Sequence, residues 1–352
     1  GFTARLETTD GREIATRQIP PRDFPLGNGL SIGDVTADHA GITAATRLTL
    51  EGSLDNSSSR NTGRVWVYPS DPPPLDAATV ETHRGVTREC LDALAAGRTV
   101  LLLPPAGGVK KALPARFIPV FWSPLHFPNQ PGTLGATIDT AHPLWSHFPT
   151  ESHTNWQWWE LTAKSVAVDF TGLDPKIATP FRFVDKYNRN ARPVAIFEAR
   201  VGPGKLLCCT LDVESDPDER IVARTLRHAL AAHAASPGFD PAGKLSPQQL
   251  ASLIGETSLI ARSDNAHPSH PASNAVDGKP DTFWHTDWTR GTRLPTGIEL
   301  DFLKPRALTG LRYLPRQDYV NGRIKTCHFE VSADGRRWLK WGRPTTFPND
   351  RK

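Results

Sequence analysis

The feature that most constrains the fold of this chain is an unbroken apolar run, Val-Leu-Leu-Leu, at residues 100–103. A strand with one face in water alternates apolar and polar residues, so a continuous run indicates a strand buried on both faces. Residues 77–96 precede it with apolar side chains near helical spacing and end at Gly97. With residues 65–68 as the first strand, we expect a strand–helix–strand unit with a right-handed crossover.

The next apolar segments extend this unit into a domain. Residues 195–201 and 205–211 each predict a strand, and Gly202-Pro203-Gly204 forms the turn between them. Residues 219–235 then show the spacing of an amphipathic helix. The pattern predicts an α/β domain of flavodoxin-like type over residues 61–235.

The flanking regions have a different character. Residues 1–60 contain short alternating strands, which predict a partial β-sandwich. Residues 236–249 are rich in proline and glycine and indicate a linker. Short strands separated by Asp-Gly and Asn-Gly turns return in residues 250–352, a spacing typical of an antiparallel sandwich or jelly roll. The predicted fold class is therefore multidomain.

Composition excludes several classes of protein. The chain has 352 residues, is 38% hydrophobic and has a mean hydropathy of -0.40. No apolar stretch approaches the roughly 18 residues of a membrane-spanning helix. The net charge is +4, but basic and acidic residues are interspersed and no nucleic-acid motif is present, so no nucleic-acid partner is expected. The chain begins at Gly1 and has no methionine, so we expect a piece of a longer product.

No nucleophile stands where an α/β enzyme would need one. The strand at 100–103 is followed by Pro-Pro-Ala-Gly-Gly rather than by a serine or cysteine on a sharp turn. Cys208 and Cys209 lie inside an apolar strand, where a thiolate is disfavoured. The four cysteines form no C-x-x-C pair, so we expect idle thiols and no catalytic residue in this domain.

One segment leaves an enzymatic alternative open. Residues 142–160 hold three histidines, two glutamates and four tryptophans. Glycoside hydrolysis uses two carboxyl groups across a sugar, so Glu151 and Glu160 could act as such a pair. The other interpretation is a packed aromatic loop at a domain seam.

Several segments resemble the C-terminal part of family 2 glycoside hydrolases, the β-galactosidase-like enzymes. These segments are residues 64–69, 121–122, 142–144, 148–151, 156–160 and 197–202. In that family they follow the catalytic barrel as a β-sandwich and a non-catalytic amidotransferase-like domain. The Asn-Glu-Pro signature and the nucleophilic glutamate of the barrel are absent here. The resemblance, over roughly residues 1–235, implies the accessory tail of a secreted enzyme, extracellular or periplasmic.

The C-terminal region is similar to the F5/8 type C module, also called discoidin or carbohydrate-binding family 32. The similarity rests on residues 272–286, 314–318, 321–324 and 329–338. The nearest likenesses are the N-terminal domain of galactose oxidase and the galactose-binding module of bacterial sialidases. The resemblance implies a discoidin-type β-sandwich whose closing strands would lie beyond Lys352, so we expect a truncated module.

This second resemblance implies a structural calcium site. Ca²⁺ takes six to eight oxygen ligands from carboxylates, carbonyls and hydroxyls. The residues that match are Asn274, Asp277, Lys279 and Thr282. The further acidic ligand that the family takes from a later strand would be missing, so we expect an incomplete site. The alternative is an Asp-Gly turn that binds no metal.

The resemblance also implies a sugar site. Trp288 would stack on the sugar ring, while His285 and Arg316 would donate hydrogen bonds to hydroxyl groups. Pro268 stands where the sialidase module has an acidic residue, with His267 and His270 nearby, and this departure bears on galactose specificity. The expected carbohydrate-binding residues are His285, Trp288, Arg316, Asp318, Tyr319 and Asn321.

Together these observations predict a non-catalytic, carbohydrate-binding accessory portion of a secreted glycoside hydrolase. Its expected partners are a glycan, such as a galactose-containing one, and the upstream catalytic barrel of the parent chain. Two alternatives remain open at this stage. The chain could be a hydrolase acting through residues 142–160, or an assembly domain that acts through its α/β region.

Overall fold

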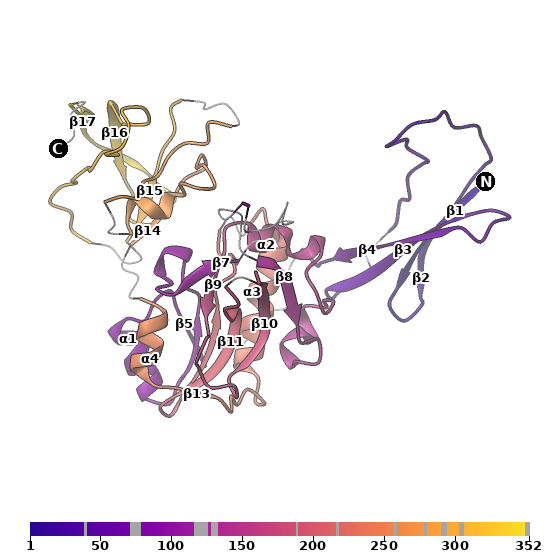
Figure 1. Ribbon diagram of the computed structural model, residues 1–352, viewed down its shortest axis with the longest axis horizontal. Coiled ribbons are helices and arrows are strands. Elements are labelled where there is room, and N and C mark those ends of the chain that lie inside the picture. Colours follow the sequence, from indigo (N-terminus) through magenta and orange to yellow (C-terminus); the bar gives the residue numbers. More distant parts are fainter. Residues whose placement is uncertain are drawn as a thin grey trace.

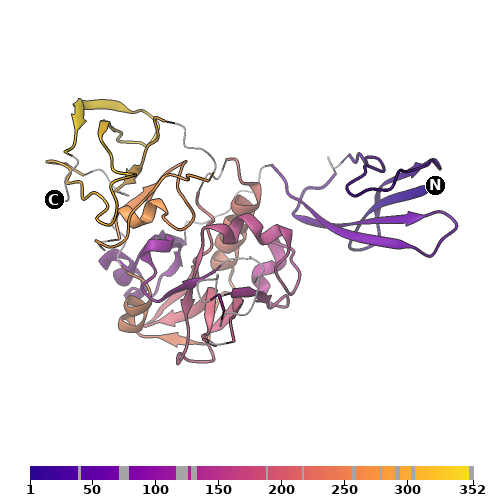
Figure 2. The same ribbon diagram turned by 45° about the horizontal axis from the view of Figure 1, so that its top comes forward.

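The computed structural model shows three regions in chain order (Figures 1 and 2). An N-terminal sheet projects from one side of a central body, and the C-terminal region lies against the other side of that body. None of the helices in the described part of the chain has the length and apolar character that crossing a membrane requires. The structure describes residues 1–38, 41–70, 79–115, 126–127, 133–187, 189–215, 218–255, 259–277, 280–289, 294–302 and 306–348.

The N-terminal region is a single antiparallel sheet with the order β2-β1-β3-β4. Its strands are β1 (Phe2–Thr8), β2 (Glu13–Ile19), β3 (Thr46–Leu54) and β4 (Arg60–Val67). Strand β4 contains residues 65–67, which the sequence analysis assigned to the α/β unit. In the structure Trp66 pairs with Arg47 of β3, so that assignment was wrong. A short apolar run indicates a strand but does not specify its partner.

The strand–helix–strand unit forms around the doubly buried run, with a different first strand. Its elements are β5 (Val80–His83), α1 (Arg88–Ala95) and β6 (Thr99–Leu102), and β5 and β6 are parallel. The Thr87 side chain caps α1 by accepting a hydrogen bond from the backbone N–H of Cys90. On β6, Leu101 faces one apolar core, and Val100 and Leu102 face the other, which confirms the prediction of a two-sided strand.

The central sheet as a whole is mixed, which corrects the flavodoxin-like expectation of a parallel sheet. Its main path is β5-β6-β12-β11-β10-β8. Strand β12 (Gly204–Cys209) is parallel to β6, whereas β11 (Pro193–Val201), β10 (Ala178–Asp185) and β8 (Thr133–Ile138) are antiparallel to their neighbours. The reason lies in the turn at Gly202, where φ is +61°, because a short hairpin connection can join only antiparallel strands.

Helices cover both faces of this sheet (Figure 1). Helix α3 (Ile221–Ala235) packs on one face with the 3₁₀ helix η2 (Pro143–His147), beside the buried rings of Phe148 and Trp158. Helices α1 and α4 (Pro247–Leu253) cover the other face. The remaining short elements of the central region are η1 (Ala106–Gly108), β7 (Ala112–Pro114), η3 (Trp156–Trp158), α2 (Trp159–Ala163), β9 (Val166–Asp169) and β13 (Lys244–Leu245).

The segment 236–249 is packed into the central body, contrary to its interpretation as a linker. Phe239 is buried in the core beside α3, and β13 pairs in parallel with the end of β11. Ser246 and Gln249 then form a capping box that begins α4. Because the partner of β13 is more than forty residues away in the chain, composition alone could not show that this segment is ordered.

The C-terminal region is rich in irregular backbone between two antiparallel strand pairs. The first pair is β14 (Ile260–Arg262) with β15 (Glu299–Asp301), and the second is β16 (Thr326–Val331) with β17 (Leu339–Thr346). The 3₁₀ helix η4 (Ala272–Ala275) lies next to η1 of the central body. The predicted strands near 297–302 and 327–332 are present as β15 and β16, but residues 308–314 form no strand.

Packing of the segment 236–249 can be tested at two glycines. A Cβ atom at Gly243 would lie 2.4 Å from Cα of Ile177, whereas a Cβ at Gly238 would meet no atom within 4 Å. We expect Gly243→Ala to lower the free energy of unfolding by about 1–3 kcal/mol, because backbone must move to admit the methyl group. Gly238→Ala is the matched control. Urea unfolding followed by tryptophan fluorescence measures the stability of both variants. Equal unfolding midpoints would contradict the packing of residues 236–249 into the central body.

Candidate functional site

The C-terminal region gathers aromatic and histidine side chains from residues 267–288. The rings of His267 and Trp288 are stacked, with centroids 3.7 Å apart and planes 4° from parallel. His285 lies edge-on to Trp288 at 5.0 Å, and His270 is tilted at 5.8 Å. Trp288 remains 51% exposed, so the cluster fixes an indole that still presents surface to solvent.

Backbone hydrogen bonds hold the two segments of this cluster together. The N–H of His267 donates to the carbonyl of His285 at 2.8 Å, and the N–H of His285 donates to the carbonyl of His270 at 3.1 Å. These bonds join residues 267–270 to residue 285. They place the three imidazoles around Trp288.

The ring nitrogens present both a donor and an acceptor. Nδ1 of His267 accepts from the backbone N–H of Ser269, which leaves the proton of a neutral ring on Nε2. Nδ1 of His285 lies 2.8 Å from the carbonyl oxygen of Thr286, an acceptor, so Nδ1 donates and Nε2 carries the lone pair. The ring proton of His267 is thus on Nε2, whereas Nε2 of His285 faces Gly322.

Arg316 joins the cluster through Phe283. Its guanidinium carbon lies 4.1 Å from the centre of the Phe283 ring, and the His270 ring stacks on Phe283 at 4.3 Å. Asp318 accepts two hydrogen bonds from Arg316, at 2.8 and 2.6 Å. These bonds lower the pKa of the Asp318 carboxyl to about 2, and they hold the guanidinium in one orientation.

A tight turn closes one side of the site. Gly322 has φ of +76°, and a Cβ atom there would lie 2.3 Å from Nε2 of His285. Both the backbone conformation and the close approach therefore require glycine. Asn321 precedes this turn and is exposed, and Tyr319 is 66% exposed beside Arg316.

The structure brings some of the predicted sugar-site residues together. His285, Trp288 and Arg316 are brought together, with Asp318 and Tyr319 beside Arg316. The structure adds Phe283, His267 and His270. The two histidines were noted near Pro268 but not assigned to the site, and the spacing His-x-x-His was the only signal for them.

Two of the expected calcium ligands, Asp277 and Thr282, contact each other. The Thr282 hydroxyl donates to the two carboxylate oxygens of Asp277 at 2.9 and 2.7 Å. The side-chain amide of Asn274 donates to the carbonyl of Phe283. Lys279 lies outside the described residues. The carboxylate and hydroxyl oxygens of Asp277 and Thr282 are ligands of the kind that Ca²⁺ takes.

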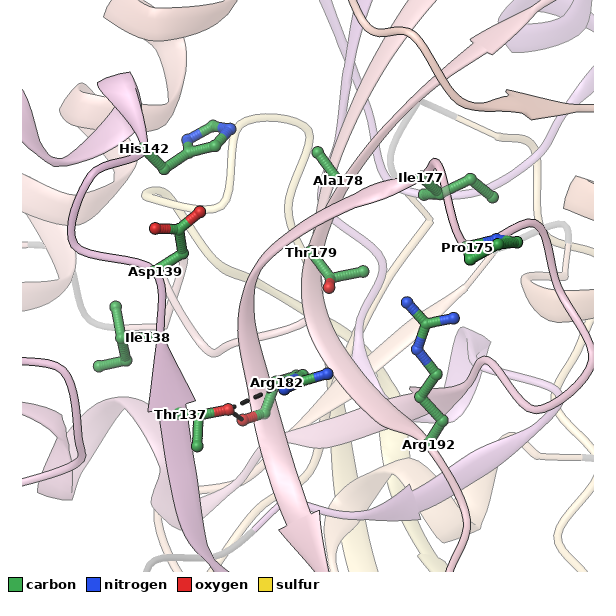
Figure 3. Close-up of a pocket in the computed structure, with 10 residues that line it drawn as sticks. All are labelled: Thr137, Ile138, Asp139, His142, Pro175, Ile177, Ala178, Thr179, Arg182 and Arg192. Atoms are coloured by element: carbon green, nitrogen blue, oxygen red, sulfur yellow. Dashed lines mark hydrogen bonds between the residues drawn. The ribbon is translucent and has the colours of Figure 1, made fainter.

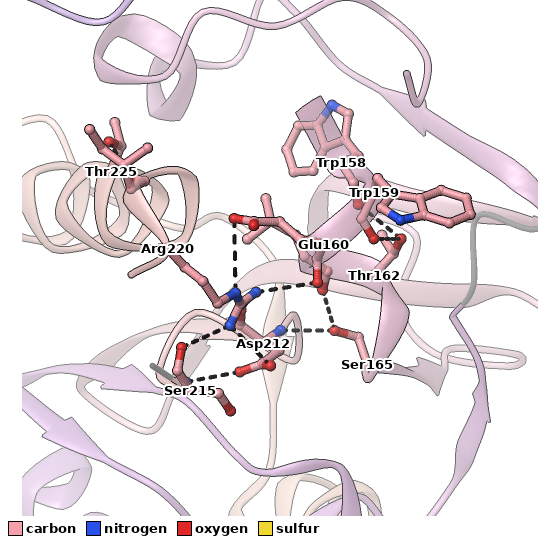
Figure 4. A network of polar contacts seen from close by, with 11 residues as sticks. Trp158, Trp159, Glu160, Thr162, Ser165, Asp212, Ser215, Arg220 and Thr225 are labelled. Atoms are coloured by element: carbon pink, nitrogen blue, oxygen red, sulfur yellow. Dashed lines mark hydrogen bonds and ion pairs between the residues drawn. The ribbon is translucent and has the colours of Figure 1, made fainter. Parts of the chain in front are cut away.

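The carboxylates of the segment 142–160 are committed to arginines. Glu151 lies 3.4 Å from Arg64 and accepts a hydrogen bond from Asn155 at 2.8 Å, which links the N-terminal sheet to the central body. Glu160 faces Arg220, which also contacts Asp212 (Figure 4). These contacts give both glutamates a structural role as partners of cations.

The thiols of the central region are poorly suited to nucleophilic attack. Burial raises the pKa of Cys90 to about 11 and that of Cys209 to about 12, and it also raises the pKa of Cys208 well above its ordinary value. At neutral pH these side chains are protonated and enclosed in the core.

Residues 121–122, one of the segments that resemble family 2 glycoside hydrolases, lie outside the described residues.

Comparison with known families separates the same three regions. Residues 2–69 and 82–255 match two family models, each described as a domain of unknown function (DUF8488 and DUF8487, respectively). Residues 259–352 match the model of the F5/8 type C domain.

Individual relatives share only a segment with this chain. A sialidase of Micromonospora viridifaciens is 30% identical over 131 residues, which are 37% of this chain and 19% of the sialidase. A galactose oxidase of Gibberella zeae is 32% identical over 92 residues, which are 25% of this chain and 14% of the oxidase. An A type blood N-acetyl-alpha-D-galactosamine deacetylase of Flavonifractor plautii is 31% identical over 91 residues, 25% of this chain and 12% of that enzyme.

The chain thus spans less than a fifth of the length of each of these relatives. All three are named for chemistry on sugars, and residues 259–352 of this chain form an F5/8 type C domain.

Proposed function

We propose that this chain is a carbohydrate-binding accessory portion of a glycan-acting protein. The observation that carries the proposal is the half-exposed Trp288, fixed by His267 and flanked by His285, within an F5/8 type C domain. An aromatic face packs against the C–H surface of a sugar ring, and the flanking ring nitrogens and Arg316 bind its hydroxyl groups.

A galactose-containing glycan is the ligand class we propose. The names of the galactose oxidase and N-acetyl-galactosamine deacetylase relatives support this class. A module that holds its parent enzyme on such a glycan raises the local substrate concentration by tethering.

The parent chain is also part of the proposal. The resemblance of residues 64–69 and 197–202 to family 2 glycoside hydrolases supports an upstream catalytic barrel of that family in a secreted protein, with the central region as its amidotransferase-like accessory domain. The central sheet is mixed and covered by helices on both faces, and its thiols are buried. These features are consistent with a scaffold that positions the two flanking regions.

Trp288→Ala tests the sugar site. We expect the affinity for galactose or lactose to fall at least about tenfold, equivalent to about 1.4 kcal/mol, because the stacking surface is lost. Isothermal titration calorimetry measures the affinity. Trp338→Ala removes another exposed indole of the same region, at 42% exposure, and is the matched control.

Two results would contradict this assignment. One is equal sugar affinity in Trp288→Ala and the unmodified chain, which would place the site elsewhere. The other is no heat with either sugar from the unmodified chain, which would reject galactose as the ligand.

Acid should destabilise the same cluster. The pKa of His270 lies below its ordinary value of 6.5. Burial is the largest cause, followed by the nearby His267, His285 and Arg316, whereas Asp318 acts in the opposite direction. The folded state therefore binds a proton less readily than the unfolded chain. Its stability rises with pH through the window just below 6.5 and falls as the solution is acidified through that window.

Thermal melting of the C-terminal region between pH 7.5 and pH 5, followed by near-ultraviolet circular dichroism, checks this expectation. His270→Asn should reduce the loss of melting temperature on acidification. An unchanged pH profile in His270→Asn would show that other groups cause the loss of stability in acid.

Calcium is the metal that we propose for Asp277 and Thr282, with carbonyl oxygens of Asn274 and Lys279. We expect CaCl₂ to raise the melting temperature of the unmodified chain, by mass action of a ligand that binds only the folded state. Asp277→Asn should abolish the rise, and exposed Asp264→Asn should retain it. A chain that melts at the same temperature in CaCl₂ and in chelator would refute the site.

A further inference from the structure

A second cluster of ionisable side chains lies inside the central body, far in the sequence from the sugar site. Glu198 projects from β11, His233 comes from the last turn of α3, and His142 immediately precedes η2. Nε2 of His233 lies 2.6 Å from Oε1 of Glu198, and Nε2 of His142 lies 3.4 Å from the same oxygen. One ligand atom from each residue falls within 4.8 Å of the other two.

This is an unusual place for a carboxylate. Glu198 stands in the strand Pro193–Val201, whose other residues are apolar except for Arg200, and its side chain is only 7% exposed. Burial raises the pKa of Glu198, but the hydrogen bonds and charges of His142 and His233 outweigh burial and lower it overall. The core therefore contains a negative charge at which two imidazoles are aimed.

We propose that His142, Glu198 and His233 form a binding site for a divalent transition-metal ion such as Zn²⁺. Two imidazole nitrogens and one carboxylate oxygen are a donor set that zinc takes in proteins, with a fourth position left for water or a ligand. Imidazole favours zinc, copper, iron or nickel over calcium or magnesium. The dication would also neutralise the buried charge of Glu198.

The three ligands come from rigid supports. Strand β11 lies inside the sheet between β12 and β10, and α3 packs on the sheet through the aromatic core. His142 is held where its ring meets the edge of His233, with centroids 5.2 Å apart. Three separate elements therefore hold the ligand atoms close to one another before an ion binds.

A polar hollow of about 470 Å³ is lined by His142, one of the three ligands (Figure 3). His142 and Asp139 lie on one side of it, and Arg192 lies on the other, with Arg182 below Thr179. His142 is 13% exposed, the most accessible of the three ligands. The open coordination position would be reached from this hollow, where the two guanidinium groups favour an anionic ligand such as a carboxylate.

Binding requires two rearrangements. The ion must replace the proton between His233 and Glu198, because 2.6 Å is a direct hydrogen bond. Nδ1 of His142 accepts from the N–H of Leu144 at 3.3 Å. When Nε2 coordinates the ion, the ring proton resides on Nδ1, so this long contact is lost.

The test uses the full chain, freed of metal with a chelator and then titrated with Co²⁺. Tetrahedral cobalt gives visible absorption bands between about 500 and 650 nm, and competition with Zn²⁺ then gives the zinc affinity. We expect one ion per chain. Glu198→Gln keeps the shape and a hydrogen-bonding oxygen but removes the charge, and should weaken binding at least about a hundredfold.

Two histidines of the sugar site supply the control. His267→Asn combined with His270→Asn should leave the cobalt spectrum unchanged. Because Glu198→Gln can destabilise the core, His142→Ala at the edge of the hollow is the second variant, and it should also lose the bands while retaining the melting temperature to within a few degrees.

Three results would overturn the proposal. The first is that the metal-free chain gains no visible bands with Co²⁺ and binds no Zn²⁺. The three residues would then form a hydrogen-bonded triad without a metal. The second is full binding in His142→Ala. The third is loss of binding in the double variant of His267 and His270, which would place the ion in the C-terminal region.

Discussion

Burial on both faces of the central sheet is the constraint on which the rest of this structure depends. Strand β6 sends Leu101 to one core and Val100 and Leu102 to the other, so helices must cover both sides. Helix α3 meets this need on one face, and α1 with α4 meets it on the other. By contrast, the N-terminal sheet buries only Ala4 and Leu48 among its apolar side chains. The central body therefore supplies most of the stability from which the other regions extend.

The same burial gives the polar groups inside the central body their importance. An unpaired carboxylate in such a core would be strongly unfavourable, and Glu198 is retained only with two imidazoles beside it. Arg220, likewise, bridges Glu160 and Asp212 between α2 and α3. These networks differ in one respect. In the arginine network one guanidinium lies between two carboxylates, whereas in the histidine network two imidazoles surround one carboxylate, with His142 at the edge of a hollow.

The C-terminal region shows a different arrangement of chemistry, at the surface rather than in a core. Its aromatic rings stack on histidine and arginine, so Trp288 and Arg316 are oriented, and Trp288 remains half-exposed. Backbone bonds between His267, His270 and His285 make this possible without a large buried core. A shallow, pre-oriented surface of this kind suits a ligand that binds by ring faces and hydroxyl groups.

The sequence by itself determined the features that depend on local pattern. The run at 100–103 required a doubly buried strand, and residues 272–286 identified the F5/8 type C region. Only the tertiary structure decided which segments meet. Residues 65–67 joined the N-terminal sheet, the hairpin at Gly202 made the central sheet mixed, and the apparent linker paired with β11. It also brought His142, Glu198 and His233 together from positions 35 to 91 residues apart. Periodicity records which side of an element is apolar, but partner choice depends on long-range packing that no local window contains.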